Sequence, residues 1–337
     1  MIGHSRYNAA DHAPVGVMGD HVHDQGEWML SYRFMHMDMQ GNRLGADAID
    51  PDRIATSIPN RFFGRPMQPP TLRIVPTRMS MQMHMFGAMY APTRWLTLMA
   101  MGMYVEKEMD HITYMGGKGT ARRGNFRVKT DGIGDTRLSG LIRMHDDGMH
   151  AVHLNAGISL PTGSNTKTHE ILTPPGTRPT VRVPYAMQLG SGTYDLVPGI
   201  TYNGHVEKWY WGGQYLGTFR TGADNGYSLG DRHELSAWLN YQWQPFISTA
   251  LRVQFDTLES IDGIDPMIAG PVQTADPDNY GGDELKLNLG VNLMGQSGGL
   301  AGHRLAVELS LPLYRDLNGP QMETDWTVMA GWQYAFE

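Results

Sequence analysis

The chain alternates apolar and polar residues over most of its length. In the stretch 284–293, Leu or Val occupies the odd positions, and Glu284, Lys286 and Asn288 lie among the even ones. The final stretch, 326–336, alternates in the same way and has aromatic residues at both ends of its apolar face. A period of two indicates a β-strand with one apolar face. Aromatic ends are typical of a strand that crosses a membrane, although a half-buried strand of a soluble sheet alternates too.

The number of alternating segments favours a large all-β fold. We count about twelve of them, and no stretch has a convincing helical period. Many exceed the ~9–11 residues that a tilted membrane strand needs, so we expect them to project beyond the bilayer. The predicted strands are 27–40, 74–90, 93–109, 132–145, 149–161, 185–203, 206–221, 228–243, 246–258, 283–295, 301–314 and 322–336.

The connections between these segments alternate between long and short. The long ones are 41–73, 110–131, 162–184 and 259–282, and the short ones are 91–92, 146–148, 203–204, 244–245 and 295–299. Outer-membrane barrels have tight periplasmic turns and long extracellular loops, whereas a soluble sandwich gives no reason for this difference. The sequence therefore predicts a transmembrane, antiparallel, up-and-down β-barrel of about twelve strands, with both termini in the periplasm.

Composition narrows the alternatives. The chain of 337 residues has no apolar run long enough for a transmembrane helix. It has no cysteine, which excludes disulfides, zinc-thiolate sites and a cysteine nucleophile. Its net charge of −7 argues against a nucleic-acid partner. Residues 1–6 lack the apolar core of a signal peptide, so we expect the numbering to be that of a processed chain.

Several segments resemble a family of outer-membrane transporters named for the MetA pathway of phenol degradation. The matching pieces are 132–138 (GIGDTRL), 154–163 (LNAGISLPTG) and 189–199 (LGSGTYDLVPG). The segment 13–21 (APVGVMGDH), with the Met-rich strands after it, resembles a subgroup of that family. The resemblance implies an outer-membrane β-barrel with a role in the uptake of aromatic or other small compounds.

The face predicted to line the barrel carries charges of both signs. One interpretation is a lumen that selects solutes by charge, as rings of side chains do in pores. The other is that these charges pair across neighbouring strands and fill a narrow barrel. A twelve-stranded barrel lies between the eight-stranded kind, which side chains fill, and the sixteen-stranded kind, which is open, so strand number does not decide between the two interpretations. The predicted lumen-lining residues are Arg33, Asp135, Arg137, Arg143, Asp195, Arg232, Glu234, Arg252, Asp256, Glu284, Lys286, Arg304 and Glu308.

Methionine is the second candidate for chemistry, with 24 residues crowded into Met-X-Met runs. Thioethers and imidazoles are soft ligands that suit Cu(I). The alternative is that methionine serves as a flexible apolar residue. In 79–85 the methionines lie opposite Ser80, Gln82 and His84, which predicts that they face lipid. In 27–40 they share the inward side with Arg33. The candidate copper ligands are Met35, His36, Met37, Met39, His21 and His23, and no other cofactor is expected.

One domain is expected, a barrel formed by residues 27–337. Residues 1–26 precede it as a polar periplasmic segment, which either plugs the lumen or is flexible. The proline-rich loop 41–73 is a candidate lid over the outer mouth. Outer-membrane phospholipases offer a precedent for catalysis on a twelve-stranded barrel, but no serine matches His150 on its face of the strand. We expect no enzymatic activity.

These observations predict a passive channel for small solutes, aromatic or hydrophobic ones among them, in the outer membrane of a diderm bacterium. Its partners would be outer-membrane lipid or lipopolysaccharide and the solute itself. The alternative from another class is a Met/His-rich copper-binding or structural outer-membrane protein with a closed lumen. The transported substrate, the direction of transport and the oligomeric state are left open by the sequence.

Overall fold

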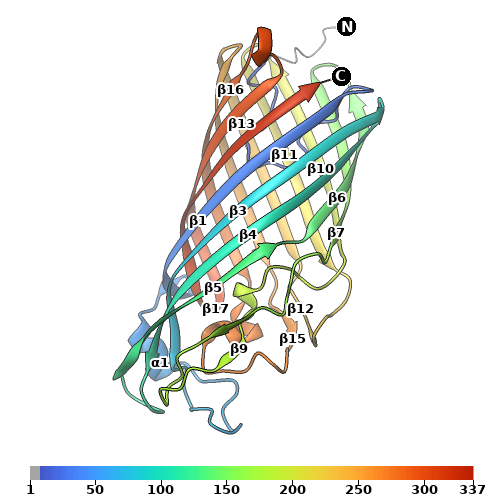
Figure 1. Ribbon diagram of the computed structural model, residues 1–337. Coiled ribbons are helices and arrows are strands. Elements are labelled where there is room, and N and C mark those ends of the chain that lie inside the picture. The colour runs from blue at the N-terminus through green and yellow to red at the C-terminus, as the bar shows by residue number, and fades with distance from the viewer. Residues whose placement is uncertain (1–7, 337) are drawn as a thin grey trace.

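The computed structural model describes residues 8–336 and shows one antiparallel sheet that closes on itself (Figure 1). Closure occurs because β17 pairs with β16 on one side and with β1 on the other. The short turns and the end of β17 lie together at the top of Figure 1, which we call the turn end; the long connections gather at the bottom, the loop end. This is the all-β barrel that the alternation predicts.

The wall is made of long strands that follow one another round the ring. Their bounds are β1 Trp28–Gly45, β3 Ile74–Thr93, β4 Leu96–Tyr114, β6 Thr136–Asp146, β7 His150–Leu160, β10 Asp195–Val206, β11 Trp209–Arg220, β13 Arg232–Gln244, β14 Ile247–Leu258, β16 Gly282–Met294 and β17 His303–Phe336.

Shorter elements lie towards the loop end, apart from one 3-10 turn in the connection between β16 and β17. They are β2 Asp47–Ala48, α1 Pro51–Ser57, β5 Arg122–Ile133, β8 Thr168–Glu170, β9 Thr180–Arg182, β12 Tyr227–Ser228, β15 Asp262–Gly263 and the 3-10 turns η1 Tyr185–Met187, η2 Gln273–Ala275 and η3 Pro277–Asn279; the exception is η4 Gly298–Leu300.

β17 is a hairpin rather than a single straight strand. Its 34 residues would extend for more than ~100 Å if straight. Leu317 lies opposite both Gly282 of β16 and Gly45 of β1, and the pairing on the two sides of Leu317 runs in opposite directions. The chain therefore reverses near Leu317 and crosses the wall twice. In residues 8–336 the eleven wall strands make twelve passes, as predicted.

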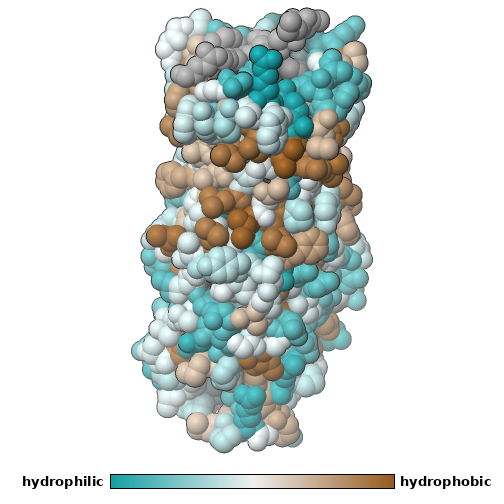
Figure 2. All heavy atoms as spheres, turned by 90° about the vertical axis from the view of Figure 1, so that its right-hand side faces the viewer, coloured by the Kyte–Doolittle hydropathy of each residue, from teal (hydrophilic) through white to brown (hydrophobic). Residues whose placement is uncertain are grey.

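The barrel is apolar outside and polar inside. A row of outward leucines, Leu239, Leu251, Leu289 and Leu309, runs across paired strands, and each is more than a third exposed. Their neighbours along each strand, such as Asn288, are buried on the other face. Figure 2 shows hydrophobic residues gathered in a belt in the upper half of one face, with hydrophilic residues above and a more mixed surface below. The strands thus project beyond the apolar belt at the loop end.

Replacing Leu289 by Arg is expected to lower the free energy of unfolding by about 2–4 kcal/mol, because an arginine near the bilayer midplane is poorly solvated. Leu289 is 49 % exposed within the apolar row. Reversible urea unfolding in lipid vesicles measures the change, with Leu289→Ala as the control for lost packing. An arginine variant as stable as the alanine variant would place this row outside the hydrocarbon.

The structure differs from the sequence expectations at three connections. The predicted loop 110–131 is wrong, because β4 continues to Tyr114 and β5 returns beside it as a strand. The predicted strand 185–203 begins only at Asp195, because residues before it turn into the mouth of the barrel. In loop 41–73 the helix α1 was missed, although Asp50 and Pro51 form a recognisable start; the Asp50 carboxylate accepts a hydrogen bond from the Arg53 amide.

The loop end is covered by its own apolar cluster. Phe62, Tyr185, Tyr227, Ile268 and Val272 come from four different connections and pack together. The proline-rich connection that the sequence suggests as a lid thus contributes Phe62 to a cover shared with other loops. Within the described residues, no helix has the length and apolar character to cross a membrane.

Candidate functional site in the barrel lumen

Residues 8–26 are here called the inner segment; residues 8–23 lie inside the barrel, and the exposed residues 24–26 lead from there to the start of β1. The backbone of residues 8–23 is bound by side chains from strands all round the ring, which is possible only from within. Among these contacts, Asn240 donates to the carbonyl of His12 (2.8 Å) and Gln214 to that of Met18 (2.9 Å). Four more wall side chains, Asn203, Arg143, Arg304 and Ser248, donate to the carbonyls of Asp20, Val22, Ala13 and Ala9, respectively. A ring nitrogen of His153 bonds to the carbonyl of Gly19, and the amide of His23 donates to the hydroxyl of Thr97. Residues 1–7 of the predicted amino-terminal segment lie outside the described residues.

The inner segment also packs closely against the wall. Trp238 breaks the alternation of β13 because it points into the lumen, where it is 5 % exposed and packs on Ala13 and Val17. Gly16 lies against the wall where even a Cβ would overlap the side chains of Arg252 and Glu308. Side-chain volume on both partners therefore fixes the position of the inner segment as firmly as its hydrogen bonds do.

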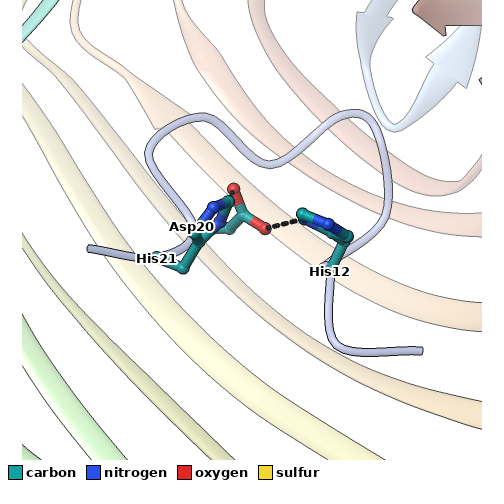
Figure 3. Close-up of side chains that lie close together, drawn as sticks. All are labelled: His12, Asp20 and His21. Carbon is teal, nitrogen blue, oxygen red and sulfur yellow. Dashed lines mark ion pairs between the residues drawn. The ribbon is translucent and has the colours of Figure 1, made fainter. Parts of the chain in front are cut away.

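Three side chains of the inner segment form a histidine cluster, defined as His12, Asp20 and His21 (Figure 3). One nitrogen from each ring and one carboxylate oxygen lie within 4.8 Å of one another. The Asp20 carboxylate is 3.1 Å from Nδ1 of His21 and 3.9 Å from Nδ1 of His12. The ring of His23 lies beside that of His21, with centroids 4.6 Å apart.

Two nitrogens at this cluster have no hydrogen-bond partner. They are Nδ1 of His12 and Nε2 of His23, and both are buried. His23 is 3 % exposed, and its other ring nitrogen lies 3.2 Å from the Glu27 carboxylate. Buried imidazole nitrogens without partners are uncommon in folded proteins. Nitrogens that converge on a carboxylate are a donor set able to hold a borderline transition metal.

Burial sets the protonation of the cluster. It lowers the pKa of His12 well below its usual value, and the Arg304 guanidinium lowers it further. Burial also lowers the pKa of His23. For His21 burial acts in the same direction, but the adjacent Asp20 carboxylate outweighs it and raises the pKa. At neutral pH the rings of His12 and His23 are therefore neutral and keep a lone pair free for a ligand.

A second feature of the lumen is a methionine wall on β1, β3 and β4. Directly opposed residues of paired strands point to the same face of a sheet. Met85 lies opposite Arg33, which is buried beside the inner segment and attracted by Asp20, so the odd positions of β3 face inward. The wall consists of Met29, Met35, Met37, Met39, Met79, Met81, Met83, Met85, Met89, Met99, Met101, Met103 and Met109.

This arrangement corrects two sequence predictions. Met79 and Met85 do not face lipid; they are buried on the inner face, and polar Ser80 and Gln82 point outward where the barrel projects beyond the apolar belt. His36 does not join Met35 in a metal site, because it lies on the outer face with its ring 5.2 Å from that of Trp326.

The opposite half of the lumen is charged. β13 is six passes from β3 in the ring, and here Arg232 binds Asp256 (2.6 Å) and Glu234 (2.9 Å). Lys286 bridges Asp256 (3.0 Å) and Glu284 (2.6 Å). The structure thus brings five of the predicted lumen residues into one network, in which each charge has a partner of opposite sign.

The remaining predicted residues lie at separate places. Arg252 and Glu308 form a buried pair (2.5 Å), and Arg304 donates to the side chains of Asn292 and Gln333 as well as to the inner segment. Asp195 is paired with Arg220, and Arg137 is half-buried nearby. Arg143 binds Asp146 at the turn end. The Asp135 carboxylate accepts hydrogen bonds from the amides of Gly163 and Ser191.

Sequence reasoning missed the residues that hold the inner segment. Asn240, Gln214 and Asn203 are uncharged, so nothing marked them as more than ordinary inward residues of their strands. Gly16 carries no chemistry of its own. A usable signal was the density of histidine and aspartate in 11–23, ahead of the first strand.

The closed antiparallel wall, the apolar belt and the polar interior define the class of protein: a β-barrel of the transmembrane kind. The solved structure of the COG4313 outer membrane channel from Pseudomonas putida F1 is similar to this chain, with a TM-score of 0.60 and 13 % identity over 94 % of this chain and 98 % of that one. The P. putida toluene transporter TodX aligns over 94 % of this chain and 91 % of that one at 10 % identity, with a TM-score of 0.47. No family model and no curated protein matches the sequence.

Proposed function

We propose that the protein is an outer-membrane channel through which small solutes move passively, with the turn end in the periplasm. The fold shared with a solved outer-membrane channel supports this, and so does the apolar belt. The resemblance of three segments to the MetA-pathway transporter family points the same way and suggests aromatic compounds among the solutes. A transmembrane barrel with tight turns at one end orients those turns towards the periplasm.

The observation that carries the proposal is the two-sided lumen. The methionine wall offers an apolar, adaptable surface, and the network around Asp256 offers paired charges on the other side. The inner segment, which is bound by Asn240, Ser248 and Arg304, narrows the lumen towards the turn end. Small solutes with one apolar and one polar side match this interior better than large sugars do.

Liposome swelling tests the proposal. Proteoliposomes of the full chain should swell faster than protein-free vesicles in isosmotic phenylalanine and glycine, and not in the trisaccharide raffinose. Swelling at the protein-free rate in every solute, by protein whose folding is confirmed by heat-modifiable gel migration, would contradict a channel. Equal swelling in raffinose would contradict the small-solute restriction.

A further inference from the structure

We propose that the methionine wall and the histidine cluster form a route for a soft monovalent metal ion, Cu(I), through the lumen. The inference deepens the proposed function by naming a substrate class, and its transport part rests on that function. Cu(I) binding by the lumen stands on the side chains alone. Thioethers line the route from the loop end, and imidazoles lie towards its turn end.

The distribution of methionine is the first argument. On β1, β3 and β4 every methionine is at an inward position, and none of the outward positions of these strands is methionine. The outward apolar positions carry other residues, such as Leu30, Phe86 and Leu98. An ordinary need for apolar surface is therefore met here by leucine and aromatics. Methionine is confined to the side of these strands that faces the lumen, and a high methionine content alone does not explain this confinement.

The spacing of the thioethers suits shared coordination. Met37 lies opposite Met81, and Met35 opposite Met83. Such opposed side chains start about 5 Å apart across the strands, and successive inward residues of one strand are about 7 Å apart. Methionine has three rotatable bonds before its terminal methyl group, so two neighbouring sulfurs can turn towards one ion. Neutral sulfur ligands select Cu(I) over hard cations.

The wall is continuous with the histidine cluster. At its loop end, Met79 and Met109 pack with Met187 from the mouth. At its turn end, Met29 and Met89 pack with Val22 of the inner segment. Val22 lies between His21 and His23 in the chain, so the last thioethers pack against the residue that joins these two histidines. An ion leaving the wall would meet imidazole and carboxylate donors.

Two cations share the inner face and would oppose a metal ion, but each is compensated. The Lys107 ammonium donates to the carbonyls of Ala186 (2.9 Å) and Gln188 (2.6 Å), which hold it against the mouth. Arg33 is attracted by the Asp20 carboxylate. A single positive charge on Cu(I) suits this balance better than a divalent ion, since repulsion grows with charge.

The test uses the full chain in detergent under anaerobic conditions, with Cu(I) supplied from a coloured chelator that competes with the protein. The wall variant carries Met35→Leu, Met37→Leu, Met81→Leu and Met83→Leu, which keep apolar volume and remove four sulfurs. The matched control carries four leucines at exposed methionines outside the wall: Met67, Met144, Met149 and Met267. We expect the wall variant to lose most Cu(I) binding and the control to lose none. Equal binding by the wall variant and the full chain would overturn the proposal.

Transport is measured in proteoliposomes that enclose an impermeant Cu(I) dye. The full chain should colour the dye faster than the wall variant or a His12→Gln, His21→Gln variant. Heat-modifiable gel migration shows that both variants are folded, and phenylalanine swelling by the full chain, which does not involve Cu(I), separates the two proposals. Cu(I) binding without dye entry would overturn the route. Loss of phenylalanine swelling in the full chain, with Cu(I) binding retained, would count against the channel instead.

Discussion

Deletion of residues 8–26 is expected to raise single-channel conductance several-fold, the largest functional effect that the structure predicts. The inner segment is bound from strands all round the wall and occupies the lumen towards the turn end. A twelve-stranded barrel is wider than the eight-stranded kind that side chains alone can fill, so we expect removal of the segment to open a wider path for water. Planar-bilayer recordings of the purified deletion variant and the full chain measure the change.

A Gly16→Val variant gives a graded version of the same test. Because a Cβ at Gly16 already overlaps the ends of the Arg252 and Glu308 side chains, the bulkier side chain must displace those ends and loosen the contact of the inner segment with the wall. Its conductance should lie between those of the full chain and the deletion. Gly222→Val is the matched control, because a Cβ there meets nothing within 4 Å. Deletion and full chain with equal conductance, both folded, would show that residues 8–26 do not limit passage.

Replacing Glu308 by Leu is expected to lower the free energy of unfolding by about 3–5 kcal/mol, the largest effect on stability. Glu308 and Arg252 are paired at 2.5 Å, with side chains only 4 % and 5 % exposed. Removing the carboxylate leaves the guanidinium buried among neutral groups such as Gln254. Urea unfolding in lipid vesicles, followed by tryptophan fluorescence, measures the loss.

The double variant Arg252→Met, Glu308→Leu is the control for that result. Replacing both charges removes the desolvation penalty together with the attraction, so most of the lost stability should return. A double variant no more stable than the Glu308→Leu variant would show that packing against Gly16, rather than charge, is what the single change disturbs.

The sequence predicts the outward face of β14 and β16 correctly and that of β3 wrongly. The predicted bounds of β14 and β16 agree with the structure to within a residue or so, because alternating leucine and polar residues there leave one choice of outward face. In β3 the same reasoning chose the wrong face. Its Met79–Met85 positions alternate with polar residues, but the polar side points to water outside the bilayer rather than into the lumen. Only the pairing of Met85 with Arg33 decides which side is inside.

The sequence by itself determined that this is a closed antiparallel barrel of about twelve passes, because a period of two and the long and short connections are local properties of the chain. The tertiary structure alone decided what fills the barrel. The contacts between His12 and Asn240, or between Ala13 and Arg304, join residues more than two hundred positions apart, and no local pattern encodes them. The methionine wall and the histidine cluster came together for the same reason: closure brings their strands and the inner segment around one shared interior.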